Sequence, residues 1–226
     1  MPIHRRQLIR SLPLLAAPAF AAASKGIRWH VITIGNLSRN RYWGESDAKP
    51  LRSAICTCTL IGGDGFQLLM DPSLANKDEM AKELDRRTGR KLDDVTAVFI
   101  THEHPDHYAG LEHFSKAAWF AAPPIAQMLN RAKTFTRPLE SAPAKLFDAV
   151  EVIATPGHSA GHHSLHFLSE GRRVIAAGDA VMTRDFFLER TAYFASSDPA
   201  QASRTIEMLA PTADIIIPGH DNYFYV

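Results

Sequence analysis

The chain of 226 residues contains only two cysteines, Cys56 and Cys58. Residues two apart in an extended strand point to the same face of a sheet, where a disulfide between them would be strained. The sequence therefore excludes a disulfide framework, and it also lacks the C-x-x-C pair typical of a zinc knuckle. We interpret the two cysteines as small buried residues.

An excess of charge of either sign is also missing, since 25 basic and 24 acidic side chains leave a formal net charge of +1. Proteins that bind nucleic acid usually carry a broad basic surface, so no nucleic acid partner is expected. No apolar run reaches the ~20 residues of a helix that crosses a bilayer, so no integral membrane span is expected. The expected partner is a small-molecule substrate, and the oligomeric state stays open.

The first 23 residues differ in composition from the rest of the chain. Arg5, Arg6 and Arg10 precede a short apolar stretch that ends in three alanines. This order is typical of a secretory signal, and the arginine pair resembles a twin-arginine signal. We expect residues 1–23 to be a twin-arginine-type signal peptide and residues 24–226 to be the catalytic domain, located in the periplasm or outside the cell. An amphipathic first helix is the alternative.

Hydrophobic periodicity and glycine turns divide the remaining sequence into short strands and helices. Strands are predicted over residues 27–34, 54–61, 66–71, 95–100, 117–120, 148–158, 162–168, 172–179 and 213–221. Helices are predicted over residues 77–87, 123–133 and 197–211, and a long loop or hairpin over 37–53. This arrangement predicts an α+β protein in which helices cover the outer faces of sheets.

Metal-ligating side chains directly follow four of the predicted strands. The stretch THEHPDHYAG, residues 101–110, comes after one of them, and later strands run into TPGH, GD and PGH. The candidate ligands are His102, His104, Asp106, His107, His158, Asp179 and His220. Strand ends on one edge of a sheet converge in space, and imidazole and carboxylate are ligands that zinc accepts. A solvated polar loop is the alternative for the first stretch alone.

The spacing within the first stretch predicts two metal ions instead of one. His102 and His104 can aim at one point from a turn, whereas Asp106 and His107 point toward a second. Two-metal hydrolases hold their ions about 3.5–4 Å apart. Asp179 has two carboxylate oxygens and is the natural bridge between them.

These motifs are similar to the ordered motif set of the metallo-β-lactamase-fold hydrolases, over residues 27–226. The resemblance implies an αββα sandwich, with two mixed β-sheets flanked by helices and the site along one edge. It implies one zinc ion on His102, His104 and His158, and a second on Asp106, His107 and His220. Asp179 and a hydroxide would bridge the two ions, and iron or manganese are alternative metals.

By the same resemblance, the chain is a dinuclear zinc hydrolase whose bridging hydroxide cleaves an ester, lactone or thioester bond. Asp106 would orient the hydroxide and accept a proton. The pattern most resembles glyoxalase II, lactonase and metallo-β-lactamase-domain-containing protein 1 members. Classical zinc β-lactamases usually have cysteine or serine at the Asp179 position, whereas lactonases carry a tyrosine near the place of Met182. The alternatives are a β-lactam amide hydrolase, a mononuclear iron dioxygenase and a non-catalytic metal-binding protein.

Aromatic residues near the predicted ligands are candidates for substrate contact, and they would favour an apolar acyl group. These residues are Tyr42, Trp43, Phe186, Phe187 and Tyr223. Among the other polar residues, we expect a structural role for His162 and a solvated turn position for Glu103. His30, His113, His163 and His166 are expected to be ordinary packing or surface histidines.

Overall fold

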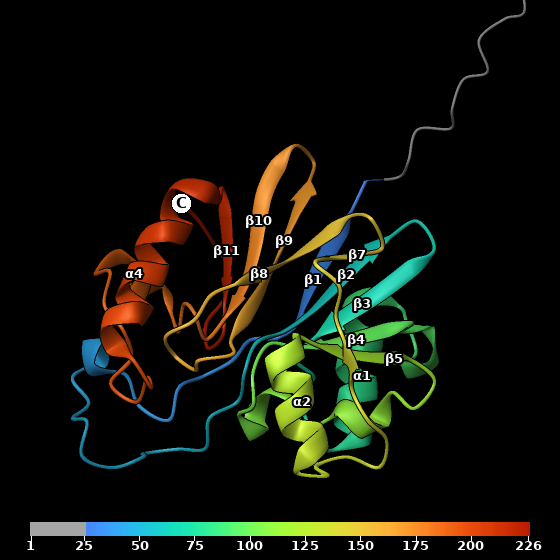
Figure 1. The fold of residues 1–226 in the computed structure, drawn as a ribbon, viewed down its shortest axis with the longest axis horizontal. Coiled ribbons are helices and arrows are strands. Elements are labelled where there is room, and N and C mark those ends of the chain that lie inside the picture. The colour runs from blue at the N-terminus through green and yellow to red at the C-terminus, as the bar shows by residue number, and fades with distance from the viewer. Residues whose placement is uncertain (1–25) are drawn as a thin grey trace, which may run out of the picture.

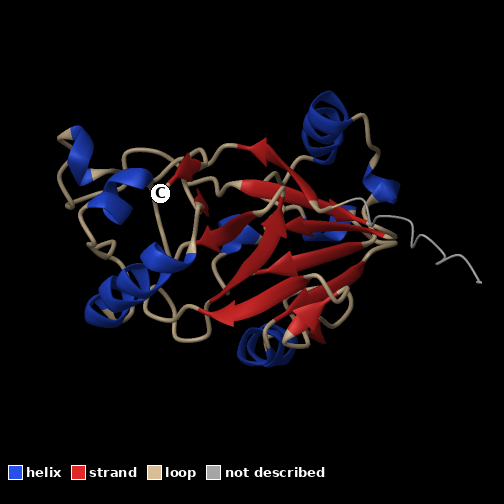
Figure 2. Cartoon of the chain, turned by 90° about the horizontal axis from the view of Figure 1, so that it is seen from above, coloured by secondary structure: helices blue, strands red, loops and turns tan. Residues whose placement is uncertain are grey.

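The structure is a computed structural model that describes residues 26–226. The predicted signal peptide, residues 1–23, lies outside the described residues. Two sheets pack face to face, and helices cover their outer faces (Figure 1). Seen from above, the strands lie in the middle of the molecule with helices around them (Figure 2).

The first sheet contains six strands in sequence order. They are β1 (Arg28–Thr33), β2 (Cys58–Gly63), β3 (Phe66–Met70), β4 (Ala97–Ile100), β5 (Ala118–Ala121) and β6 (Glu140–Ser141). The pairs β1–β2 and β2–β3 are antiparallel, whereas β3 to β6 run parallel. The sheet is therefore mixed.

The second sheet has the strand order β12–β11–β10–β9–β8–β7. Its strands are β7 (Lys145–Leu146), β8 (Val150–Ala154), β9 (His163–Ser169), β10 (Arg172–Gly178), β11 (Ile215–Pro218) and β12 (Phe224–Tyr225). Only β10 and β11 pair in parallel, so this sheet is mixed as well.

Four α-helices and five short 3₁₀ helices connect the strands in the described part of the chain. The α-helices are α1 (Lys77–Thr88), α2 (Pro123–Arg131), α3 (Arg184–Leu188) and α4 (Pro199–Leu209). The 3₁₀ helices are η1 (Arg41–Trp43), η2 (Leu92–Asp94), η3 (Pro105–His107), η4 (Leu111–His113) and η5 (Ala210–Thr212). Within residues 26–226, no helix is both long enough and apolar enough to cross a membrane.

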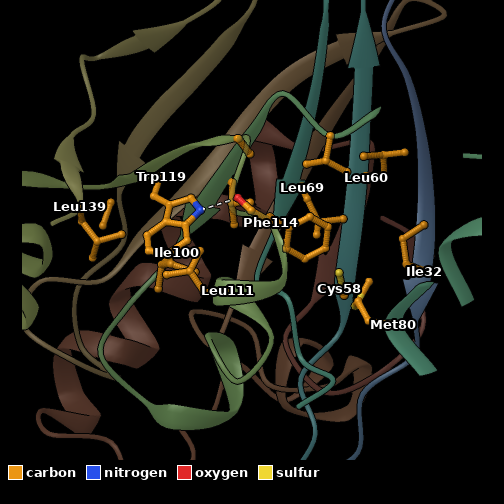
Figure 3. Close-up of a cluster of buried hydrophobic side chains, with 14 of the residues drawn as sticks. Ile32, Cys58, Leu60, Leu69, Met80, Ile100, Leu111, Phe114, Trp119 and Leu139 are labelled. Atoms are coloured by element: carbon orange, nitrogen blue, oxygen red, sulfur yellow. Dashed lines mark hydrogen bonds between the residues drawn. The ribbon is translucent and has the colours of Figure 1, made fainter. Parts of the chain in front are cut away.

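Apolar side chains form three layers of core. The central layer joins the sheets, with Phe99 of β4 and Phe167 of β9 among its members. A second layer seals the first sheet against α1 and α2 (Figure 3), and there the Trp119 indole donates a hydrogen bond to the Phe114 carbonyl at 2.9 Å. A third layer packs Ile206 of α4 on the second sheet. Burial of these faces is the main stabilising term, and it produces the predicted αββα sandwich.

The long elements follow the sequence pattern closely. Helix α1 starts at the Asn76 cap, whose side chain accepts hydrogen bonds from two backbone N–H groups, and it ends at Gly89 in the left-handed conformation. The predicted strand over 54–61 begins only at Cys58, because Thr57 pairs with the Gly219 carbonyl instead. Sequence periodicity does not predict the short elements, because two to five residues are too few for a periodic pattern. These elements are β6, β7, β12 and α3.

Candidate metal centre

Three histidines and one carboxylate oxygen converge on a first point. His102 follows β4, and His158 lies in the turn after β8. The Nδ1 atom of His104 lies 2.9 Å from the Nε2 atoms of both His102 and His158. The Oδ2 atom of Asp179 lies 3.1 Å from His158 Nε2 and 3.7 Å from His102 Nε2. These atoms can share one cation, and we call the three histidines the first ligand group.

A second set of side chains converges beside the first. His107 Nε2 and His220 Nε2 lie 3.1 Å and 3.2 Å from Asp179 Oδ1. Asp106 Oδ2 lies 3.6 Å from His220 Nε2 and 3.9 Å from His107 Nε2. Asp106, His107 and His220 can hold a cation together, and we call them the second ligand group.

The Asp179 carboxylate lies between the two groups, with one oxygen facing each. The residue directly follows β10 and is 5% exposed. Gly219 makes room for this side chain, because a Cβ atom there would lie 2.0 Å from Asp179 Oδ1. The structure thus brings together all seven predicted ligand residues at one edge of both sheets.

The Nδ1 atoms of three histidines are held by groups behind the site. His107 Nδ1 lies 2.8 Å from Asp71 Oδ2, and His102 Nδ1 lies 3.0 Å from Thr101 Oγ1. Thr101 Oγ1 in turn donates to Asp71 at 2.8 Å. His220 Nδ1 faces the carbonyls of Asn36 (3.1 Å) and Ile55 (3.0 Å). These partners place the proton on Nδ1 and leave each Nε2 lone pair for a cation.

Asp71 is a functional residue that the sequence analysis missed. It follows β3 directly and is fully buried, and its other carboxylate oxygen accepts a hydrogen bond from the Thr101 backbone N–H at 2.9 Å. Burial raises the pKa of this carboxyl, against the opposing effect of His107. The only signal in the sequence is a single carboxylate at the end of an apolar strand, which does not by itself distinguish Asp71 from an ordinary polar strand end.

The electrostatics of the site favour a bound cation. Burial lowers the pKa of His102 well below its ordinary value and also lowers that of His158, so both imidazoles are neutral ligands. Burial alone would raise the pKa of Asp179, but His107, His220 and His158 hold it well below its usual range. The carboxylate is therefore anionic. Divalent metals take such sets of neutral imidazole and anionic carboxylate ligands.

Two atoms at the centre make the fit to a metal more specific. His107 Nε2 and Asp179 Oδ1 are buried and lie 3.1 Å apart, but neither makes a hydrogen bond of good geometry to any described residue. Buried polar atoms without partners are costly, and bound ions are a common explanation for them. The donor set therefore fits a divalent metal pair.

Cys56 lies beside Asp71 and His107, but its chemistry differs. Burial raises the pKa of its thiol to about 12, so it is uncharged at neutral pH. His107 Nδ1 is already engaged by Asp71. Cys56 is thus a buried thiol beside His107, whereas Cys58, the first residue of β2, is buried in the apolar core of the first sheet.

The predicted substrate residues lie in different environments. Tyr42 and Trp43 are exposed on the loop after β1, with 38% and 56% of their surfaces accessible. Phe186 and Phe187 are at most 2% exposed, so the prediction that they contact substrate is corrected: both belong to the core. Tyr223 is 39% exposed and packs edge to face on Trp29 of β1 at 5.0 Å.

The remaining polar residues mostly have structural contacts. His162 is buried, and its Nδ1 atom lies 2.8 Å from Thr155 Oγ1. Glu103, expected to be solvated, instead accepts a hydrogen bond from Ser159 Oγ at 2.8 Å. This bond joins the turn that carries His102 and His104 to the turn that carries His158.

The surface histidines contact other groups. His163 lies 2.8 Å from the Gly161 carbonyl, and His166 lies 2.9 Å from Glu151 on the neighbouring strand. His113 faces the carbonyls of Leu74 and Ala75, and His30 is exposed. Among residues 26–226, none of these four belongs to a group that could hold a metal.

Comparison with known proteins agrees with this geometry. Human metallo-beta-lactamase domain-containing protein 1 is 34% identical over 137 residues, which cover 59% of this chain and 50% of that protein. The chain thus spans about half the length of the curated mammalian relatives that it matches. An N-acyl homoserine lactonase of Bacillus thuringiensis is 27% identical over 188 residues, covering 75% of this chain and 72% of the lactonase.

Solved structures share the fold. The structure of AidC, described as a dizinc quorum-quenching lactonase, superposes with a TM-score of 0.63 at 16% identity. The superposition covers 87% of this chain and 85% of AidC. The sequence profile of the metallo-beta-lactamase superfamily matches residues 52–220, which include all seven converging residues. The chain belongs to the metallo-β-lactamase superfamily.

Proposed function

We propose that this protein is a dinuclear zinc hydrolase that cleaves an ester, lactone or thioester bond of a small molecule. The observation that carries the proposal is the position of Asp179, whose two oxygens face two separate ligand groups. A mononuclear site would use one group and would leave the other buried imidazoles without a partner. The lactonase name of the B. thuringiensis relative and the dizinc description of AidC support the same conclusion.

In this proposal the first ion takes His102, His104 and His158, and the second takes Asp106, His107 and His220. Asp179 bridges the two. When bound, the ion pair lowers the pKa of a coordinated water toward neutrality and polarises the scissile carbonyl. The Asp179 and Asp106 carboxylates offset much of the charge of two divalent cations. Asp71, Thr101 and the Asn36 and Ile55 carbonyls hold the imidazoles in the ligating orientation.

The role of Asp106 follows from its exposure. Its side chain is 24% accessible, whereas that of Asp179 is 3% accessible. The Asp106 side chain therefore lies at the solvent side of the second group, where its carboxylate can orient an attacking water and accept its proton. The same carboxylate can return the proton to the leaving oxygen or sulfur, so that Asp106 ends in its starting protonation state.

A groove that starts one residue before Asp106 is a candidate site for a substituent of the substrate. It has a volume of about 800 Å³ and begins at Pro105, next to Asp106. Tyr108 and Phe135 line it and pack edge to face at 5.1 Å. These two rings can bury part of an acyl chain, while Glu112, His113 and Lys133 give the same groove a polar side. Tyr42 and Trp43, on the loop near His220, remain proposed contacts as well.

A substrate panel tests the proposed function. The zinc-loaded protein would be assayed with short- and long-chain esters, lactones, thioesters, a cephalosporin and a phosphodiester. We expect turnover of the first three classes and loss of both metal and turnover in the His104→Ala variant. Two bound ions without turnover of any substrate would favour a non-catalytic metal-binding protein. Turnover of the cephalosporin alone would favour a β-lactamase.

Export is a separate part of the proposal. The arginine pair Arg5-Arg6, the apolar stretch and the alanines in residues 1–23 support a twin-arginine signal. The protein would then act in the periplasm or outside the cell. Fractionation of cells that express the full chain should place processed protein outside the cytoplasm. The double substitution of Arg5 and Arg6 by lysine should retain the unprocessed chain inside.

A further inference from the structure

The loop of residues 36–55 starts and ends beside a proposed metal ligand. Asn36 and Ile55 close the loop as an isolated antiparallel bridge, with N–H to carbonyl distances of 2.8 Å and 3.2 Å. We call Gly35, Asn36, Ile55 and Thr57 the neck of this loop. Both bridge carbonyls also face His220 Nδ1, at 3.1 Å and 3.0 Å. The neck therefore holds the imidazole of His220 directly.

Thr57 holds the backbone on both sides of the same histidine. Its N–H donates to the Gly219 carbonyl at 2.6 Å, and its hydroxyl donates to the Asp221 carbonyl at 2.8 Å. The hydroxyl oxygen also accepts a hydrogen bond from the Gly35 N–H at 3.0 Å. Thr57 is 2% exposed, so these bonds form out of reach of bulk water.

We propose that Thr57 is the positioning residue for His220, and hence for the second ligand group; this rests on the proposed metal function. Two bonds from Thr57 fix the residues before and after His220, and the third joins its hydroxyl to the neck whose carbonyls orient the ring. With backbone and Nδ1 both held, His220 Nε2 faces Asp179 Oδ1 at 3.2 Å and Asp106 Oδ2 at 3.6 Å.

The two backbone segments of the neck are packed closely together. A Cβ atom at Gly35 would lie 2.6 Å from the Ile55 carbonyl oxygen and 2.7 Å from the Thr57 nitrogen. The two sides of the neck are thus in direct backbone contact. If the Thr57 hydroxyl is removed, the Gly35 N–H and the Asp221 carbonyl lose this partner.

The chain offers a matched control two residues away. Thr59 is 1% exposed, but its hydroxyl makes no hydrogen bond to any described residue. A Thr→Val substitution keeps the shape of the side chain and removes only the hydroxyl. At Thr59 this change should be neutral or stabilising, since it removes a buried polar group without a partner. At Thr57 it should disturb His220.

The experiment compares T57V, T57S and T59V with the wild-type protein. Zinc affinities come from titration against a competing chelator, and the His220 ring nitrogens are followed by ¹⁵N NMR. We expect T57V to weaken one of the two ions about 10-fold or more, the typical cost of losing an outer partner of a metal ligand. The other ion should change little. T57S and T59V should bind both ions within about twofold of wild type.

Equal zinc binding by T57V and T59V, or weakened binding by T57S as well, would overturn the proposal. If T57V does not fold in the metal-free state, T57A and T59A make the same comparison. A wild-type protein that binds no metal would refute the proposed function itself. A wild-type protein that binds two ions, together with a T57V variant that does the same, would refute only the role of Thr57.

Discussion

Asp179 is the side chain that contacts both ligand groups of the site. It is nearly inaccessible to solvent, and three histidines keep it anionic. A carboxylate in such a position is costly unless opposite charge compensates it. Four imidazole nitrogens lie within 3.1–3.7 Å of its oxygens. Together with the carboxylate they can bind the metal cations that would supply the opposite charge. Its two oxygens also connect the two ligand groups.

The Asp179→Asn substitution tests this connection. Asparagine keeps the shape but loses the negative charge and offers only one acceptor oxygen. We expect the variant to bind at most one zinc ion and to lose at least about 100-fold in kcat/KM, because a direct ligand should matter no less than an outer partner, whose loss costs up to about 100-fold. Metal analysis and kinetics on the same preparation measure both. A variant that holds two ions with unchanged activity would contradict the assignment of Asp179 as the bridge.

Asp71 should matter although it does not face the metal position. The Asp71→Asn substitution would weaken the hydrogen bond that orients His107, and we expect about 10- to 100-fold weaker metal binding. Asp64 provides the control, because it is exposed and lines a groove that contains none of the ligand residues. The Asp64→Asn substitution removes the same charge without touching the site. A chelator competition assay compares the two. Equal affinities would show that His107 needs no such partner.

At the residue scale, the sequence predicts the ligands but not their supports. The seven ligand residues stand out because they cluster within motifs at strand ends. Asp71 and Thr101 follow apolar strands singly, and nothing local separates them from ordinary caps. Glu103 looks like a solvated turn residue because its partner Ser159 is 56 positions away. The sequence predicts that Phe186 and Phe187 contact substrate, whereas the structure buries both. Their burial depends on long-range packing, which no local pattern shows.

At the scale of elements, the site is built from the ends of strands and the turns that follow. Strand β4 carries the first cluster, and β8, β10 and β11 lead to His158, Asp179 and His220. The turns stay in place because they are joined to each other, for example by Ser159 and Glu103. Long strands and helices were predictable from periodicity, whereas β6, β7, β12 and α3 form only in the context of the whole fold.

The start of β11 depends on an ion pair with a clear pH signature. Asp214 accepts hydrogen bonds from the Arg173 backbone N–H and guanidinium, both at 2.7 Å, and the Arg173 side-chain hydrogen bond lowers the pKa of Asp214 to about 2. Because the pKa of Asp214 in the folded protein is below the ordinary value of 3.8 for this group, the pair stabilises the fold above about pH 4. That contribution is lost as the pH falls from about 4 to 2.

The Asp214→Asn variant should therefore be less stable than wild type at pH 6, and the difference should shrink toward pH 2. Urea unfolding of both proteins in the presence of a chelator measures this without a contribution from bound metal. Because the pair is exposed, the effect is small. A difference that is constant from pH 6 to pH 2 would mean that the charge of Asp214 is not involved.

At the scale of the whole molecule, the metal centre joins the two sheets. The His102–His107 cluster belongs to the first sheet, and His158, Asp179 and His220 follow strands of the second. Bound cations would therefore hold the two halves of the sandwich together at one edge. The αββα architecture itself was predictable, because alternating strand and helix patterns and the family motifs point to the same fold.

Removal of metal should lower the stability of the whole chain. A ligand present at 100 times its Kd stabilises a protein by about 2.7 kcal/mol, so we expect a chelator to lower Tm by several degrees. The Asp179→Asn variant, which should bind at most one ion, should respond less. Thermal unfolding followed by circular dichroism provides the measurement. Equal Tm values with and without zinc would contradict a metal that joins the sheets.

The central claim is that two ions bind on opposite sides of one carboxylate. Anomalous diffraction at the zinc edge from crystals of the zinc-loaded protein tests it most directly. We predict two peaks about 3.5–4 Å apart. One peak should lie among His102, His104 and His158, and the other among Asp106, His107 and His220, with Asp179 touching both. A single peak, or two peaks that Asp179 does not bridge, would contradict the account.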